Sequence, residues 1–212
     1  MHIHLNDQNQ FLRVLPTGNV EFDANTYQPA HTLTPEQADA FRVRPMQPTP
    51  TPAYNTLTHD IRAATPLLLE GTWTQQWDVY PLPADEVAAN FTAAREAAWN
   101  RIKAERDRRK FAGVKVGQHW FHSDDSSRIQ QLALAMMGAN MQSGLQWKTL
   151  TLSPPPVFVT MTPALAAAIF QATAASDAAI FAAAEAHRIA MEASSDPQGY
   201  DCTSGWPATI DG

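Results

Sequence analysis

Apolar and polar positions along the chain follow two different periods, which change at about residue 84. Upstream, short runs alternate in steps of two, as the residues of a half-buried strand do. Residues 72–80 alternate most clearly, and Glu70-Gly71 ahead of them predicts a tight turn in a two- or three-stranded antiparallel unit. Thr34 and Pro35 predict a helix of one or two turns. Further strands are predicted at residues 2–5, 10–15, 20–22, 56–63 and 66–70, with turns at Asn6-Asp7-Gln8-Asn9 and Thr17-Gly18-Asn19.

Downstream, apolar positions recur every three or four residues, which is the period of an amphipathic helix. A first long helix is predicted at residues 84–111, and Gly113 ends it. After a hairpin at residues 114–122, Ser123-Asp124 caps a second helix that ends before Gly144. The apolar residues that recur at helical spacing in the first helix are Val87, Phe91, Ala94, Ala98 and Ile102. The second helix has its apolar face at Ile129, Leu132, Ala133, Met136 and Met137. Two strands follow, at residues 145–152 and 157–161.

The last helix is predicted from Thr162 to about Ala193, roughly 45 to 50 Å at 1.5 Å per residue. Its Ala-Ala-Ile-Phe sequence repeats after eleven residues, which keeps one apolar stripe nearly straight along the helix. Because propensity alone does not stabilise such a helix, we expect it to pack on the first long helix or on copies of itself. An intramolecular core helix and an oligomer seam are equal alternatives. The interface candidates are Ile169, Phe170, Ile180, Phe181 and Met191.

Proline divides the chain, because ten of its 16 prolines lie within residues 16–83 and the next is Pro154. Prolines at alternate positions in residues 45–52 predict an extended linker and argue against a central strand. The predicted fold class is α+β. A small, Pro-rich, β-rich module occupies residues 1–83, and a tail occupies residues 196–212. Residues 84–195 form an α+β domain in the order helix, hairpin, helix, two strands and a long Ala-rich helix.

Composition refines this organisation without changing it. Alanine accounts for 35 of the 212 residues, and 15 of these alanines lie in residues 164–193. The modest share of large apolar residues therefore belongs to one closely packing helix and does not indicate a disordered chain. Cys202 is the only cysteine, which excludes an intrachain disulfide framework.

The sequence also bears on where the chain is made. No signal-peptide pattern is found at the N-terminus, and residues 163–180 are judged too weakly apolar for a bilayer span. These observations predict a cytosolic product without membrane insertion.

Charge is unevenly placed, although the net charge is only -6. Residues 95–110 carry 7 basic and 3 acidic side chains, whereas the rest of the chain is acidic. A basic cluster of this kind can bind nucleic acid, but no glycine-rich or aromatic pattern accompanies it. A solvated helix end is the favoured explanation of the cluster, since cations suit the negative pole of the helix dipole. We predict no nucleic-acid binding.

Candidate chemistry is sparse. His119 and His122 are candidate metal ligands, but residues three apart in a strand point to opposite faces, so a structural role is favoured. His2 and His4 share a strand face, and a metal site between copies of the chain in a symmetric oligomer is a further alternative there. The sequence has no nucleophile elbow, P-loop or dinucleotide-binding glycine pattern. We predict no enzyme activity, no catalytic or cofactor-binding residues and no cofactor, with a metal-dependent enzyme at His119 and His122 as a distant alternative.

Several segments between Gly117 and Thr162 resemble a C-terminal domain of unknown function found in tailed-bacteriophage tail-fibre, tail-fibre-assembly and baseplate-associated proteins. The segments are Gly117-Gln118-His119-Trp120-Phe121-His122-Ser123-Asp124, Ser127-Arg128-Ile129-Gln130-Gln131, Leu145-Gln146-Trp147-Lys148-Thr149 and Val157-Phe158-Val159-Thr160-Met161-Thr162. The resemblance covers about residues 84–195, and the Pro-rich region ahead of it is similar to modules that precede this domain in phage tail proteins.

The resemblance implies a structural or adhesive role in the virion and supplies no catalytic residues. We expect a component of the tail tip, baseplate, fibre or receptor-binding assembly, made in the host cytoplasm and retained in the virion tail. Its expected partners are other tail or baseplate proteins, further copies of itself with a trimer favoured, and a host surface receptor. A tail-fibre assembly chaperone, absent from the mature particle, is the alternative.

Overall fold

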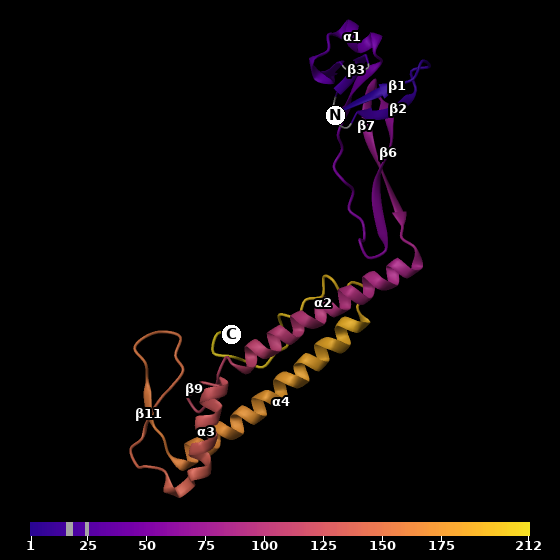
Figure 1. The fold of residues 1–212 in the computed structure, drawn as a ribbon. Helices are drawn as coiled ribbons and strands as arrows, with labels where there is room; N and C mark the ends of the chain where they lie inside the picture. Colours follow the sequence, from indigo (N-terminus) through magenta and orange to yellow (C-terminus); the bar gives the residue numbers. More distant parts are fainter. Residues whose placement is uncertain (16–18, 24–25) are drawn as a thin grey trace. The chain divides into compact units, whose positions relative to one another are not determined.

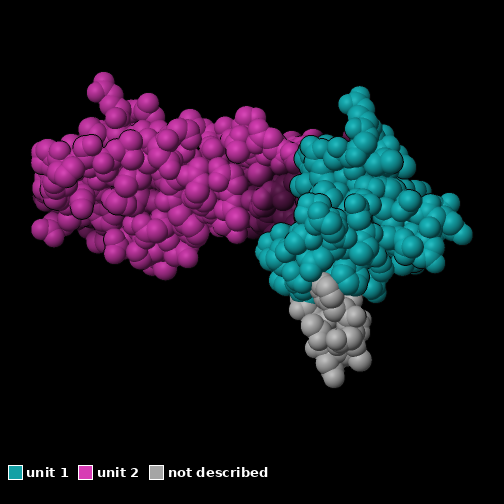
Figure 2. Space-filling model, turned by 90° about the horizontal axis from the view of Figure 1, so that it is seen from above, with its two compact units in different colours: residues 1–90 teal, residues 91–212 magenta. Residues whose placement is uncertain are grey.

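A computed structural model describes residues 1–15, 19–23 and 26–212 of the chain. Of these residues 41% are helical and 25% lie in strands, which confirms the α+β class. The chain forms two compact units, unit 1 from Met1 to Asn90 and unit 2 from Phe91 to Gly212 (Figure 2). Of the turn predicted at Thr17-Gly18-Asn19, the first two residues lie outside the described residues.

Unit 1 is rich in strands and has one short α-helix. Its elements are β1 (His2–Leu5), β2 (Phe11–Leu15), β3 (Asn19–Asp23), β4 (Thr26–Pro29), a 3-10 helix (Ala30–Thr32), α1 (Pro35–Ala40), β5 (Val43–Gln47), β6 (His59–Leu69) and β7 (Thr72–Pro81). Five strands form one sheet in the order β2-β1-β5-β7-β6, in which only β5 and β7 are parallel neighbours (Figure 1). Ile3, Leu5 and Met46 are buried between these strands.

The predicted hairpin of unit 1 is present. Glu70 and Gly71 join β6 to β7 with φ values of 49° and 80°, the positive values that a two-residue hairpin turn requires. The two runs predicted at residues 56–63 and 66–70 form the single strand β6, whose pairing with β7 is irregular between Ala64 and Leu67. Pro66 lies in this irregular stretch at the sheet edge, where a missing N–H is tolerated.

The Pro-rich run at residues 45–52 is not a free linker, so this prediction was wrong. Its first residues belong to β5, the middle strand of the sheet. The Met46 amide donates to the Met1 carbonyl, so the nitrogen of the preceding residue, Pro45, faces away from β1 and toward β7. Because β5 pairs with β7 only from Met46 onward, the missing N–H of Pro45 is not needed for this pairing. Thr49 then binds along β7 through the Gln75 carbonyl at 2.9 Å and the Trp77 indole nitrogen at 3.2 Å.

Unit 2 contains most of the long helix α2 (Ala84–Lys110), which begins in unit 1. The remaining elements are β8 (Val114–Val116), β9 (His119–Phe121), α3 (Asp125–Met137), a 3-10 helix (Gly138–Asn140), β10 (Gln146–Lys148), β11 (Phe158–Thr160) and α4 (Pro163–Ala193). The strands form two hairpins, β8 with β9 and β10 with β11. The order predicted for this region is therefore confirmed, although the last two strands are shorter than predicted.

One face of helix α4 is buried, both near the start and near the end of the helix. Near its start, Ala166 and Ile169 pack with Val114, Phe121 and Met161. Near its end, Ala184 and Met191 pack with Ala98 and Ile102 of α2. The long helix therefore packs on the first long helix, which is one of the two arrangements that the sequence predicts.

The segment predicted as a tail, residues 196–212, belongs to unit 2 and packs on its helices. Tyr200, Cys202 and Trp206 pack against the buried cluster formed by α2 and α4. His187 of α4 stacks on Trp206 with 5.0 Å between ring centroids, and its ring donates to the Ser204 carbonyl at 2.8 Å. These contacts involve residues distant in sequence, which is why periodicity did not indicate them.

Asp124 caps α3, as predicted, and this predicts an acid-sensitive contribution to stability. Its carboxylate accepts from the Ser126 and Ser127 hydroxyls and the Ser127 amide, and these bonds hold the pKa of Asp124 far below its usual value near 3.8. A lowered folded-state pKa means that the contribution is complete above pH 3.8 and is lost as the pH falls further. Asp124→Ala is expected to lower the free energy of unfolding at pH 7 by about 1 kcal/mol.

The matched control is Asp124→Asn, because asparagine also caps helices but does not titrate. Urea unfolding at pH 7 and at pH 3 measures both effects. The asparagine variant is expected to lose less stability than wild type between these two pH values, and an equal loss in both would contradict the role of the Asp124 carboxylate.

Candidate functional site

Helix α3 turns a different face to the core than its apolar pattern predicts. Gln131 is buried at 2% exposure and donates to the His122 carbonyl at 2.7 Å. Arg128, one turn earlier, donates to the carbonyls of Ser123 and Lys110. Because residues three apart share a helix face, these polar bonds orient α3 and leave its apolar face outward. Arg128 also forms an ion pair with Asp177 of α4.

The outward face of α3 is a surface of large apolar side chains. Met136 is 79% exposed and Ile129 is 69% exposed, values far above those of a core face. Leu132 and Met137 are 41% and 46% exposed. Phe170 of α4, at 45%, adjoins this face, and we call these five residues the α3 surface. A folded protein rarely exposes a contiguous apolar patch without a use for it.

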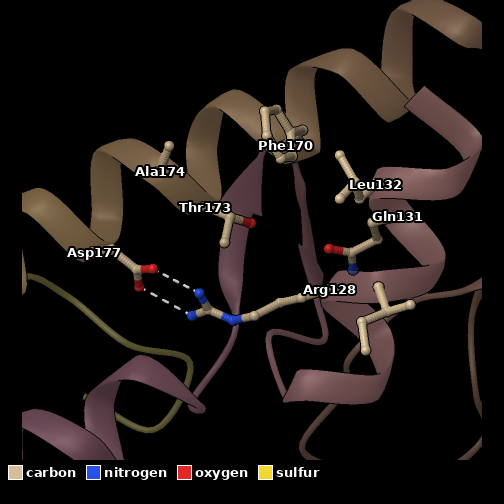
Figure 3. Close-up of a pocket in the computed structure, with 8 residues that line it drawn as sticks. Arg128, Gln131, Leu132, Phe170, Thr173, Ala174 and Asp177 are labelled. Atoms are coloured by element: carbon tan, nitrogen blue, oxygen red, sulfur yellow. Dashed lines mark hydrogen bonds and ion pairs between the residues drawn. The ribbon is translucent and has the colours of Figure 1, made fainter. Parts of the chain in front are cut away.

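A groove of about 250 Å³ lies between α3 and α4 at this surface (Figure 3). Ile129 and Leu132 line it from α3, and Phe170 and Ala174 line it from α4. Most of its wall is apolar, and it opens to solvent. The groove is therefore suited to receiving an apolar side chain.

The polar end of the groove is internally satisfied. Arg128 and Asp177 form a two-pronged ion pair, with nitrogen to oxygen distances of 2.6 and 3.0 Å. Both side chains are mostly buried, at 19% and 26% exposure, so the pair fixes α3 against α4. Thr173 donates to the Ile169 carbonyl within α4. These groups hold the groove in shape and do not form an acid, base and nucleophile set.

Charge distribution is the sequence signal that would have found this surface. Of the 15 basic and 21 acidic residues in the chain, residues 129–176 contain only one, Lys148. This segment supplies all of α3 after Arg128, the hairpin of β10 and β11, and the first part of α4. A long uncharged stretch that remains exposed after folding marks a surface that avoids the usual solvating charges.

The interface candidates from the sequence fall into two groups. Ile169, Ile180 and Met191 are 0%, 1% and 2% exposed within a single chain, so they form part of its own core. Phe170 and Phe181 are 45% and 47% exposed and remain accessible. Phe181 lies under Arg106, with 5.1 Å from the guanidinium carbon to the ring centroid. Only Phe170 belongs to the groove.

The candidate metal ligands lie in different surroundings. His119 lies in β9 opposite Val116, whereas His122 lines a separate hollow of about 230 Å³ beside Lys148 and Thr149. His2 and His4 lie in β1, and burial lowers the pKa of each. Among the described residues, no three His, Cys, Asp or Glu side chains are placed to hold a metal ion.

The basic cluster at the end of α2 is occupied by the C-terminal segment. Arg109 is 8% exposed and donates to the Pro207 carbonyl at 2.9 Å and to Glu105 at 2.6 Å. Hydrogen bonds from Arg108 and Arg109 hold the pKa of Glu105 below its usual value. Further bonds join Arg108 to Asp211, and Arg101 to the carbonyls of Gln198 and Tyr200. The cluster thus fastens the C-terminal segment along α2.

Among the described residues, α4 is the one helix long and apolar enough to span a membrane by length and composition. Its most apolar 18-residue window has a mean hydropathy of 1.5, and 22% of that window is buried. Core helices of soluble proteins pass the same test. The sequence argument that composition rules out a span was therefore wrong, and the absence of membrane insertion stays a prediction.

Unit 2 is an α+β unit with a long helix pair and a mostly apolar groove, whose only charged residues are paired with each other. Its sequence matches the model of a domain of unknown function, DUF4376, over residues 93–204, which is just over half of the chain. The chain belongs to this family. No curated protein and no solved structure matches the chain.

Proposed function

We propose that this chain is a structural component of a bacteriophage tail that acts by binding other proteins and has no enzymatic role. The α3 surface carries the proposal, because exposed apolar patches of this kind are typical of protein interfaces. The bacteriophage context comes from the resemblance of residues 84–195 to domains of tail-fibre, tail-fibre-assembly and baseplate-associated proteins.

Within such a tail the chain contributes to host attachment at the tail tip, the baseplate, a fibre or a receptor-binding assembly. The 31-residue helix α4 packed on α2 supports this role, because a long helix pair makes a stiff element. The extended linker predicted at residues 45–52 does not add support for this role, since residues 45–49 are held in or along the sheet. Its proposed partners are tail and baseplate proteins, copies of itself and a host receptor.

Mass spectrometry of purified virions from a phage or prophage that encodes this chain tests the proposal. The chain is expected in mature particles at a fixed ratio to known tail proteins, and it should remain after a wash in high salt because the proposed contact is apolar. Presence in infected cells together with absence from mature particles would exclude a virion component. That outcome would favour the tail-fibre assembly chaperone.

A further inference from the structure

We infer that the α3 surface is where copies of this chain bind one another, a step that rests on the proposed function and names one of its partners. The exposed apolar area of the α3 surface is large enough to form much of an interface. A Phe side chain presents on the order of 200 Å² when fully exposed, and the other four side chains are smaller. Five of them at roughly half exposure therefore offer at most about 500 Å², which is still a large part of the about 800 Å² that each partner buries in a standard interface. The exposed Ala133 of α3 and Ala174 of α4 add to this area.

Charge selects a second copy as the occupant. Nucleic acid or an anionic membrane requires a surface with free cations, but residues 129–176 contain only Lys148, and Arg128 is paired with Asp177. A second copy presents an equally uncharged surface. The chain carries a net charge of -6, so two copies repel each other least where neither has charges.

Shape points to the same occupant. Met136 protrudes at 79% exposure, one helical turn after Leu132, and Leu132 lines the groove of about 250 Å³ together with Ile129. Protruding side chains and a groove on one surface are the two complementary halves of a self-association interface. In such a pairing, side chains of one copy enter the groove of the other, where Leu132 and Phe170 receive them.

Light scattering on the full chain across a dilution series measures the association. Wild type is expected to have a mass of at least twice 23.3 kDa at high concentration and to dissociate on dilution. Met136→Lys places a charge in the surface and is expected to weaken association by about tenfold or more. Lysine suits the last turn of α3, so the fold is expected to be retained, which circular dichroism checks.

Two further variants keep the test specific. Ile189→Lys makes the matched change near the end of α4, at a residue that is 58% exposed and lies outside the α3 surface, and should leave the mass unchanged. Ala174→Phe fills the groove without adding charge and should weaken association. A wild-type chain that is monomeric at every concentration would overturn the inference, as would wild-type mass in both Met136→Lys and Ala174→Phe. A monomeric chain found in virions removes this inference alone, whereas an oligomer absent from virions removes the proposed function alone.

Discussion

Ile180→Asp is expected to lower the free energy of unfolding by about 4 kcal/mol or more, which is a large fraction of the about 5 to 15 kcal/mol that stabilises an ordinary domain. Ile180 is 1% exposed in the middle of α4. A carboxylate at this position must either lose its water without a partner or pull α4 away from the core, and both are costly. Thermal and urea unfolding followed by circular dichroism measure the loss.

Phe181→Asp is the matched control, because it places the same charge one residue further along α4. Phe181 is 47% exposed and lies near Arg106 and Lys110, so an aspartate there gains nearby cations in exchange for the ring contacts. Its expected cost is below about 1 kcal/mol. If Ile180→Asp abolished association while unfolding like wild type, Ile180 would belong to a seam between copies and not to the core of one chain.

Local signals explain why the helices could be predicted closely. Thr162 caps α4 by accepting from the Leu165 amide, and Pro163 occupies the first position of the helix. Asp124 caps α3 in the same way, and Gly113 follows α2 with a φ of 93°. Each signal lies within a few residues of the helix end that it sets, so a single sequence contains the information.

The candidate site depended on contacts that local patterns do not contain. The apolar residues of α3 were predicted as its core face, yet the helix is oriented by Arg128 and Gln131, whose partners are Lys110, His122 and Asp177. A polar residue is buried when distant groups satisfy it, and a hydrophobic period cannot detect those groups. The prediction for the Pro-rich run failed for a related reason. Pro45 can lie in β5 because the pairing of β5 with β7 starts only at Met46, and a local sequence pattern does not show where that pairing starts.

Phe121→Ala is expected to lower the free energy of unfolding by about 3 to 5 kcal/mol, the range for removing a fully buried ring. Phe121 is 0% exposed and is the largest of the fully buried side chains among the described residues. It packs with Val114 of β8, with Ile169 of α4 and with Met161, which precedes α4. Its removal therefore leaves a cavity between the hairpin of β8 and β9 and the long helix α4. Urea unfolding measures the loss.

Phe158→Ala is the control for Phe121→Ala, since Phe158 of β11 is 54% exposed and its removal should cost less than about 1 kcal/mol. The comparison also bears on the candidate site. Leu134 and Ala135 of α3 pack against the cluster that contains Phe121, so the same core positions the helix that carries the groove. Phe121→Ala should therefore weaken self-association even at temperatures where the variant remains folded. Equal losses of stability in Phe121→Ala and Phe158→Ala would mean that the Phe121 ring is not the centre of this core.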